Sequence, residues 1–230
     1  MTQLRNQSVG SIVADHFNTA AVFKSVGIDF CCGGHQSLEA AAADHGLNLT
    51  TLEEHLAETI KAGDGGLPDF KSWSLDFLAD YLVNVYHSKA RTMLPELKAY
   101  TEKIAEVHGA NHPELLEIAD AFRLIHSEMP LHLNEEEDSL FPAIKKALLT
   151  GDETAKAVIK AAYDGMMNDH VLIGGTMDKI RVLSQDYRLP EDACNTYLVT
   201  FKLLEAFEDD LHIHVHLENN LLFPKALALS

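Results

Sequence analysis

Two stretches of the sequence pair a histidine with a glutamate at helical spacing and then end alike. The first runs from His132 to Pro142 as HLNEEEDSLFP, and the second runs from His214 to Pro224 as HVHLENNLLFP. In each stretch a glutamate, Glu136 or Glu218, follows the histidine by four residues. Residues at this spacing lie one turn apart on the same face of an α-helix. That face can offer an imidazole nitrogen and a carboxylate oxygen to one metal ion.

The repetition extends upstream of both stretches. His87 precedes His132 by 45 residues, and His170 precedes His214 by 44 residues. The chain therefore reads as two similar halves, each with a helix that carries one histidine and a helix that carries His-x-x-x-Glu. Four such helices would bring four histidines and two glutamates together, and this set of side chains is typical of a dinuclear metal site inside a helical bundle.

The elements that must position these residues are long helices. Hydrophobic periodicity and short breaks predict an all-α fold, an up-and-down four-helix bundle, with helices over roughly 74–107, 113–148, 153–184 and 191–227. On each helix the candidate ligands continue the apolar stripe, as His170 does between Met166 and Ile173. Glu136 and Glu218 would then be buried carboxylates, which are costly unless they are paired or bind a cation.

Neighbouring residues leave some alternatives open. A single histidine on an apolar stripe is more often a hydrogen-bonded core residue than a ligand, but two copies in register favour metal binding. His212 and His216 form a second i, i+4 pair, yet the register with the first copy selects His214. We expect His212 and His216 on the solvent side or beside the ligands, and we expect Glu135 and Glu137 on a solvated acidic face.

Four further residues have two readings each. Glu128 and Asp169 either orient the imidazoles of ligands or are plain surface charges. Gly174 and Gly175, one turn after His170, either open a path for small molecules to the metals or permit close helix packing.

The sequence predicts a separate small helical domain over residues 1–62. A linker over 63–73 and the bundle over 74–230 follow it. The helices of the small domain are expected over 8–26, 36–45 and 50–61, with Gly27 ending the first and Thr50 with Glu53 forming a capping box at the third. A domain of about 60 residues is near the lower limit for independent folding. We therefore expect this domain to be stabilised by a metal or by a partner surface. A homodimer formed through this domain is one such expectation.

Cys31 and Cys32 are the candidate catalytic residues of this domain. They stand next to each other between two predicted helices and are followed by two glycines. Thiolates near a helix N-terminus have a lowered pKa, which would suit metal transfer, nitrosothiol chemistry or a redox relay. The alternative is two small residues in a tight turn. No role is assigned to Cys194.

Composition excludes several classes of function. The net charge of −17 argues against binding of nucleic acid and of anionic membrane surfaces. No apolar run reaches the roughly 18 residues needed to span a membrane, and the first residues lack the features of a signal peptide. Three cysteines do not make a disulfide framework. A cytoplasmic location is therefore predicted.

The donor set predicts the metal. Histidines combined with carboxylates in a helical bundle suit a pair of iron ions, while manganese and zinc remain alternatives. Six protein donors cannot saturate two six-coordinate ions, so positions stay open for O2, NO or water. Such a site suits redox chemistry, small-gas chemistry or labile iron.

At this point the sequence resembles a known family. Both repeated stretches resemble hemerythrin-like domains, and together with VFKSVGIDFCCGG at residues 22–34 the whole chain is similar to the repair-of-iron-centres (RIC) proteins. The resemblance implies a non-haem, carboxylate-bridged di-iron centre with both glutamates bridging. It also implies a cytoplasmic stress-response function that restores damaged iron–sulfur proteins, its partners. The implied ligands are His87, His132, Glu136, His170, His214 and Glu218. One departure is Val171-Leu172, where relatives tend to be more polar.

Three functions follow as hypotheses. The leading one is repair of iron–sulfur clusters damaged by nitric oxide or peroxide, either by supplying iron or by removing NO. The second is a hemerythrin-like carrier or sensor of O2 or NO. The third is an NO reductase, so whether the protein is an enzyme is left open, as are its electron donor and its client proteins.

Overall fold

A computed structural model of the chain describes residues 4–63 and 66–229. Helices form nearly all of its regular structure, and within these two ranges no β-strand forms. The all-α fold class is thereby confirmed. No helix in the described ranges combines the length and the apolar character needed to cross a bilayer; the cytoplasmic location stays a prediction.

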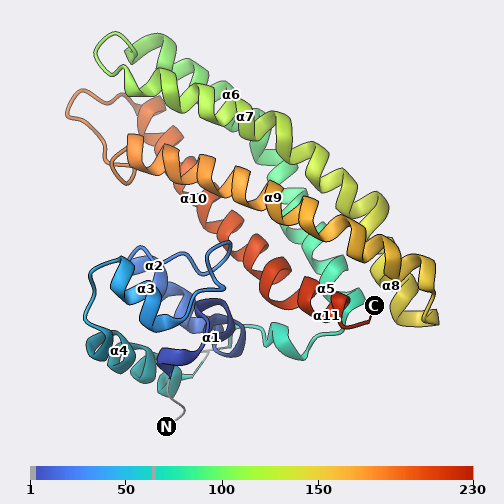
Figure 1. The fold of residues 1–230 in the computed structure, drawn as a ribbon. Coiled ribbons are helices and arrows are strands. Elements are labelled where there is room, and N and C mark those ends of the chain that lie inside the picture. The colour runs from blue at the N-terminus through green and yellow to red at the C-terminus, as the bar shows by residue number, and fades with distance from the viewer. Residues whose placement is uncertain (1–3, 64–65, 230) are drawn as a thin grey trace.

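Four long helical rods make up the C-terminal part, antiparallel to their neighbours along the chain (Figure 1). Only the third is one continuous α-helix, α9 (Glu153–Leu183). The others are each divided by a short turn of different geometry. Their α-helical parts are α5 (Leu75–Tyr81) and α6 (Ser88–His108), α7 (Glu114–Glu135) and α8 (Phe141–Thr150), and α10 (Asn195–Leu217) and α11 (Phe223–Leu227).

The dividing turns are π-helical, and each has a candidate ligand at one end. The turn η4 (Leu82–His87) ends at His87, whereas η5 (Glu136–Leu140) and η6 (Glu218–Leu222) begin at the two glutamates. In η5 the N–H of Phe141 donates to the carbonyl of Glu136, five residues back, and Phe223 repeats this bond with Glu218. Such π-turns occur frequently at functional sites.

The Phe-Pro ending of each repeat explains where two of these turns lie. Pro142 and Pro224 stand in the first turn of α8 and α11, where a proline is tolerated. Because proline has no N–H, it cannot donate to the carbonyl four residues back, and the regular α-helical ladder is interrupted there. The repeated sequence therefore creates the same local widening next to each glutamate.

The apolar core of the bundle is divided by the candidate site. One cluster occupies one side and includes Phe122, Ile125 and Met177, while the other includes Leu82, Ile144 and Leu222. The histidines and glutamates lie where the two clusters adjoin along each rod. Packing of apolar side chains on both sides thus fixes the four helices that carry the polar residues.

The N-terminal helices are α1 (Val9–Asp15), α2 (Ala20–Ser25), α3 (Leu38–Asp44) and α4 (Leu49–Ala62), and they enclose an apolar cluster of their own. Two details of the prediction are wrong. The expected helix over 8–26 is broken at His16, whose φ of −142° and ψ of 80° are not helical. The cap of α4 is Asn48, whose side chain accepts from the N–H of Thr51, and not Thr50.

This group of helices packs beside α10 (Figure 1). One close approach is at Gly10, where an added Cβ atom would lie 2.0 Å from the side-chain oxygen of Asn220. A side chain at this position would force the end of Asn220 to move. The predicted linker contributes to the packing too, because Phe70 is buried and its ring contacts Phe17 and Trp73. The domain boundaries at 62 and 73 stay a prediction.

Candidate metal centre

The six side chains expected to bind metal come together in the middle of the bundle. All of them are buried: His87, His132, Glu136, His170, His214 and Glu218. Their donor atoms form two groups of four, each with all atoms within 4.8 Å of one another. One group contains His87 and His214, the other contains His132 and His170, and Glu136 and Glu218 belong to both.

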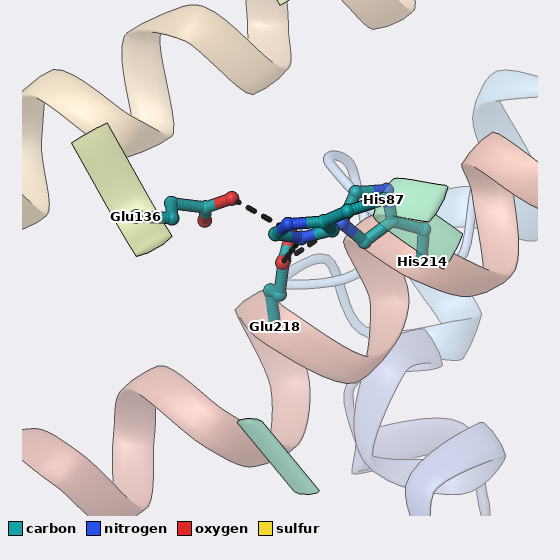
Figure 2. Close-up of side chains that lie close together, drawn as sticks. All are labelled: His87, Glu136, His214 and Glu218. Carbon is teal, nitrogen blue, oxygen red and sulfur yellow. Dashed lines mark hydrogen bonds and ion pairs between the residues drawn. The ribbon is translucent and has the colours of Figure 1, made fainter. Parts of the chain in front are cut away.

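Each of the four histidines in these groups directs its Nε2 atom toward the shared glutamates. His87 Nε2 lies 3.5 Å from Glu136 Oε2, and His132 Nε2 lies 3.4 Å from the same oxygen. His214 Nε2 lies 2.9 Å from Glu218 Oε1. Figure 2 shows one group, with Glu136 extending from one side toward His87, His214 and Glu218. The two glutamates therefore face imidazoles from different helices at once.

The nitrogens of His132 and His170 are directed at each other across the second group. Their Nε2 atoms lie 3.0 Å apart in a buried setting. Burial, together with the nearby His170, lowers the pKa of His132 to about 3. Burial also lowers the pKa of His214, although Glu218 opposes this effect. Neutral imidazoles of this kind are the form that binds metal ions.

The two carboxylates have opposite protonation preferences. Burial raises the pKa of Glu136 well above its ordinary value, and the negative charge of Glu218 acts in the same direction. Burial would also raise the pKa of Glu218, but the adjacent imidazoles of His214, His170 and His87 hold it well below its ordinary value. Without a cation the pair therefore keeps a proton on Glu136, because two buried carboxylates this close resist ionising together.

Several buried atoms at this centre have no hydrogen-bond partner within the described part of the chain. They are His87 Nε2, both carboxylate oxygens of Glu136, and Glu218 Oε2. An unpaired buried polar group is costly, and native proteins rarely keep several in one place without a ligand. Metal ions bound between the helices would satisfy these atoms together, so the residues fit a metal centre.

The other ring nitrogen of three histidines is held by a neighbouring side chain. His87 Nδ1 lies 2.8 Å from Glu137 Oε1, and His170 Nδ1 lies 2.8 Å from Asn219 Oδ1. His132 Nδ1 lies 3.3 Å from Asp169 Oδ2. An acceptor at Nδ1 places the ring proton there and leaves the lone pair of Nε2 free for a metal.

These contacts overturn one expectation about carboxylates and decide between two alternatives for others. Glu137 was expected on a solvated face, and that is wrong, because the π-turn rotates it toward His87; Glu135 is exposed as expected. Asp169 does orient an imidazole, that of His132, whereas Glu128 accepts from Ser127. The repeat contained a signal for the missed residues, since Glu137 and Asn219 each follow a glutamate of the centre by one position.

Of the two positions expected for His216, the solvent side is ruled out. Its side chain is fully buried where the N-terminal part of the chain packs on α10. Its Nδ1 lies 3.2 Å from the carbonyl oxygen of Phe30, and burial lowers its pKa to about 4. His212 is half-buried, and its ring contacts Phe30. Both histidines therefore belong to the contact between the two parts of the chain.

Cys31 and Cys32 lie in the loop between α2 and α3, against helix α9 and apart from the six donors. A lowered thiol pKa was expected here, and for Cys31 the opposite holds. A hydrogen bond with Cys32 and burial raise its pKa well above the ordinary value, and Asp29 adds to the effect. The sulfur of Cys32 lies 3.5 Å from the carbonyl oxygen of His170. At Gly174 a Cβ atom would lie 3.3 Å from this sulfur, so that glycine permits close packing.

Comparison with known families matches two parts of the chain. A family described as a domain of unknown function (DUF542) matches residues 5–60, and the hemerythrin HHE cation binding domain matches residues 78–226. The second match covers all six buried donors. It agrees with the buried histidine and glutamate groups in assigning cation binding to this part of the protein.

Relatives are similar over nearly the full length. The iron-sulfur cluster repair protein ScdA of Staphylococcus epidermidis is 32% identical over 219 residues, which cover 94% of this chain and 96% of the relative. The iron-sulfur cluster repair proteins YtfE of Dickeya chrysanthemi and Yersinia pestis are each 33% identical over 223 residues, which cover 97% of both chains.

Proposed function

Because the chain belongs to the family of iron–sulfur cluster repair proteins with a hemerythrin-like domain, we propose that it repairs iron–sulfur clusters damaged by nitrosative or oxidative stress. It does so by supplying iron from a centre that holds two iron ions. The observation that carries this proposal is the sharing of Glu136 and Glu218 between two groups of buried donors. A shared carboxylate is what a bridged pair of ions requires.

The donor set supports iron. Each ion would be held by two imidazoles and by an oxygen from each glutamate, and nitrogen with carboxylate oxygen is a combination that suits iron. Two iron ions at this centre would supply labile metal and open coordination positions. Glu137, Asp169 and Asn219 keep the imidazoles of His87, His132 and His170 oriented.

The charge of the site supports release as well as binding. Two carboxylates contribute two negative charges, fewer than the four positive charges of two ferrous ions. Glu136 must also lose its proton before it can bridge, because burial raises its pKa. Binding is therefore coupled to proton release, and protonation of Glu136 opposes it. Because the ligand charges do not neutralise the two ferrous ions, this site binds iron less tightly than a site whose ligands do.

The test uses a dehydratase whose cluster has been damaged by nitric oxide, with this protein loaded with isotopically labelled iron. The loaded protein should restore the dehydratase activity, and the label should appear in the recovered cluster by Mössbauer spectroscopy. The Glu136→Ala, Glu218→Ala double variant should fail in both measurements. The Glu135→Ala variant is the matched control, because Glu135 is an exposed neighbour of Glu136.

Two results would overturn the proposal. One is equal restoration by the double variant, which would separate repair from the buried centre. The other is recovery of activity without transfer of label, which would assign the recovery to removal of NO and not to supply of iron.

A further inference from the structure

A second group of metal-binding side chains lies in the N-terminal loop, outside the six-donor centre. Asp29, Cys31 and Cys32 line a cavity of about 190 Å³ between this loop and helices α9 and α10. Gly174, Arg181 and His212 are on its opposite walls. Cys31 is buried and Cys32 is half-buried, so both sulfurs are sheltered while the cavity gives access from solvent.

We propose that Asp29, Cys31 and Cys32 form a binding site for a thiolate-preferring divalent metal ion. The donor atoms of the three residues all lie within 4.8 Å of one another. The two sulfurs are 3.9 Å apart, and Asp29 Oδ1 lies 3.0 Å from the Cys31 sulfur. Two thiolates bound tetrahedrally to one zinc-sized ion at about 2.3 Å lie about 3.8 Å apart. The sulfurs therefore already have the separation that one shared ion requires.

The loop holds Asp29 in a fixed position with coordination capacity left. Its Oδ1 accepts from the N–H of Cys31 and its Oδ2 from the N–H of Gly33, both at 2.7 Å. Each carboxylate oxygen can accept more than one interaction, so these bonds orient the group without using all of its lone pairs. Two thiolates and one carboxylate would leave a fourth tetrahedral position for water or another ligand that enters through the cavity.

The charges around the cavity favour an added cation at this group. The neighbours of the Cys31 thiol, Cys32 and Asp29, disfavour its ionised form, as does burial. The two basic residues that line the cavity are engaged elsewhere, Lys24 with Asp209 and Arg181 with Asp178 and Glu208. A metal ion would supply the missing positive charge.

A neighbouring group of potential donors does not qualify. Asp178, Glu208 and His212 also lie within 4.8 Å of one another. However, Arg181 Nε lies 3.1 Å from Glu208, and the hydroxyl of Tyr187 donates to the same carboxylate at 2.9 Å. Glu208 is thus already neutralised and hydrogen-bonded, which leaves the cysteine loop as the cation site of this cavity.

Binding exchanges protons for the metal without any redox change. The divalent ion forms one bond to each sulfur and one to a carboxylate oxygen of Asp29, and each thiol loses its proton to solvent. About two protons leave for each ion bound, and no electron is transferred. If the proposed repair function holds, the ion taken here is ferrous iron in transit. The Cys32 sulfur contacts the backbone of His170, which places this group next to the helix that carries a ligand of the buried centre.

The test is a titration of the full, reduced chain with cobalt(II). Thiolate ligation gives an intense near-ultraviolet charge-transfer band that imidazole and carboxylate ligands do not give. We expect this band, with release of about two protons per ion bound to the thiols, in the unmodified protein. The Cys31→Ser, Cys32→Ser variant should lose the band. The Glu136→Ala, Glu218→Ala variant should keep it, so the two metal sites are tested separately.

Two controls keep the outcome decisive. The Cys194→Ser variant removes the exposed third thiol and should keep the band. Circular dichroism of the double serine variant should show unchanged helix content, and Cys32→Ser alone should lose most of the band if the double variant folds poorly. Absence of the band in the unmodified protein, or its persistence after loss of both cysteines, would overturn the proposal.

Discussion

Glu137 Oε1 lies 2.8 Å from Nδ1 of the buried His87, so the residue that follows a glutamate of the centre orients a histidine from another helix. Asn219 repeats the arrangement in the second half, where its Oδ1 lies 2.8 Å from Nδ1 of His170. The internal repeat of the sequence thus includes the supporting residues as well as the metal-binding ones. Both follow from a π-turn that begins at the glutamate.

The first prediction concerns this support. Glu137→Ala removes the acceptor that fixes the ring of His87, and it should weaken metal binding about 10- to 100-fold. Competition with a chelator under anaerobic conditions measures this affinity for ferrous iron. Glu135→Ala is the control, because it removes an equal charge from an exposed position two residues away. Equal affinity in the two variants would show that Glu137 only adds negative charge near the centre.

The second prediction separates shared from unshared donors. Glu218 belongs to both groups of donors, whereas His132 belongs to one. His132→Ala should therefore leave about one ion per chain after desalting, and Glu218→Ala should leave almost none. Elemental analysis by mass spectrometry measures both. If the two variants retained the same amount of iron, the carboxylate would not be shared.

Much of this centre could be predicted from the sequence, because His-x-x-x-Glu spacing and apolar periodicity are local properties of a helix. The bundle, its breaks and the convergence of the six donors followed from them. The π-turns could not be predicted this way, since a one-residue change in hydrogen bonding rotates Glu137 inward without altering the apolar pattern. The burial of His216 and the raised pKa of Cys31 depend on how the N-terminal loop packs on α9 and α10, which no local pattern describes.

The third prediction is the pH dependence of thiol reactivity. A hydrogen bond from His108, whose Nε2 lies 3.2 Å from the sulfur, lowers the pKa of Cys194 to about 7, and the N–H groups of Tyr197 and Thr196 contribute. Thiolate forms above that pH, so the rate of alkylation by iodoacetamide should rise with a midpoint near pH 7. In His108→Gln the midpoint should move toward 9.0, the ordinary value.

Peptide mass spectrometry reads each cysteine separately and supplies an internal comparison. Cys31 is buried and its pKa is raised, so it should stay unmodified in the folded protein over the same range. A midpoint that did not respond to His108→Gln would exclude the histidine as the cause.

The fourth prediction uses a matched pair of glycines in α9. Alanine is favoured over glycine in a helix by about 1 kcal/mol. A Cβ atom at Gly175 meets no atom within 4 Å, so Gly175→Ala should raise the free energy of unfolding by about that amount. At Gly174 the Cβ atom would lie 3.3 Å from the Cys32 sulfur, so Gly174→Ala should gain less or lose stability. Urea denaturation of the metal-free proteins measures both free energies of unfolding. Equal increases in the two variants would mean that the loop with Cys32 moves aside at no cost.

The fifth prediction concerns the connection between the helices that carry His170 and His214. Gln185, Asp186 and Tyr187 have positive φ angles there, and Tyr187 is anchored by its hydroxyl to the buried Glu208. The guanidinium of Arg181 lies 3.1 Å from the same carboxylate. Arg181→Met would leave Glu208 without its cation and should cost about 2 to 3 kcal/mol. The cost is below that of a fully buried pair, since 27% of the Arg181 side chain is exposed.

The pH dependence of this loss identifies its origin. Burial already raises the pKa of Glu208 above its ordinary value, and removal of Arg181 raises it further. When the pKa of a carboxyl is higher in the folded than in the unfolded state, the free energy of unfolding falls as pH rises. The reason is that the unfolded chain ionises at a lower pH than the folded one. The loss in Arg181→Met should therefore be full at pH 8 and nearly absent below about pH 4, where both states are protonated. The Arg181→Met, Glu208→Gln double variant should recover stability at pH 8. A loss that stayed constant with pH would assign the effect to packing of the arginine stem, because packing does not depend on the ionisation of Glu208.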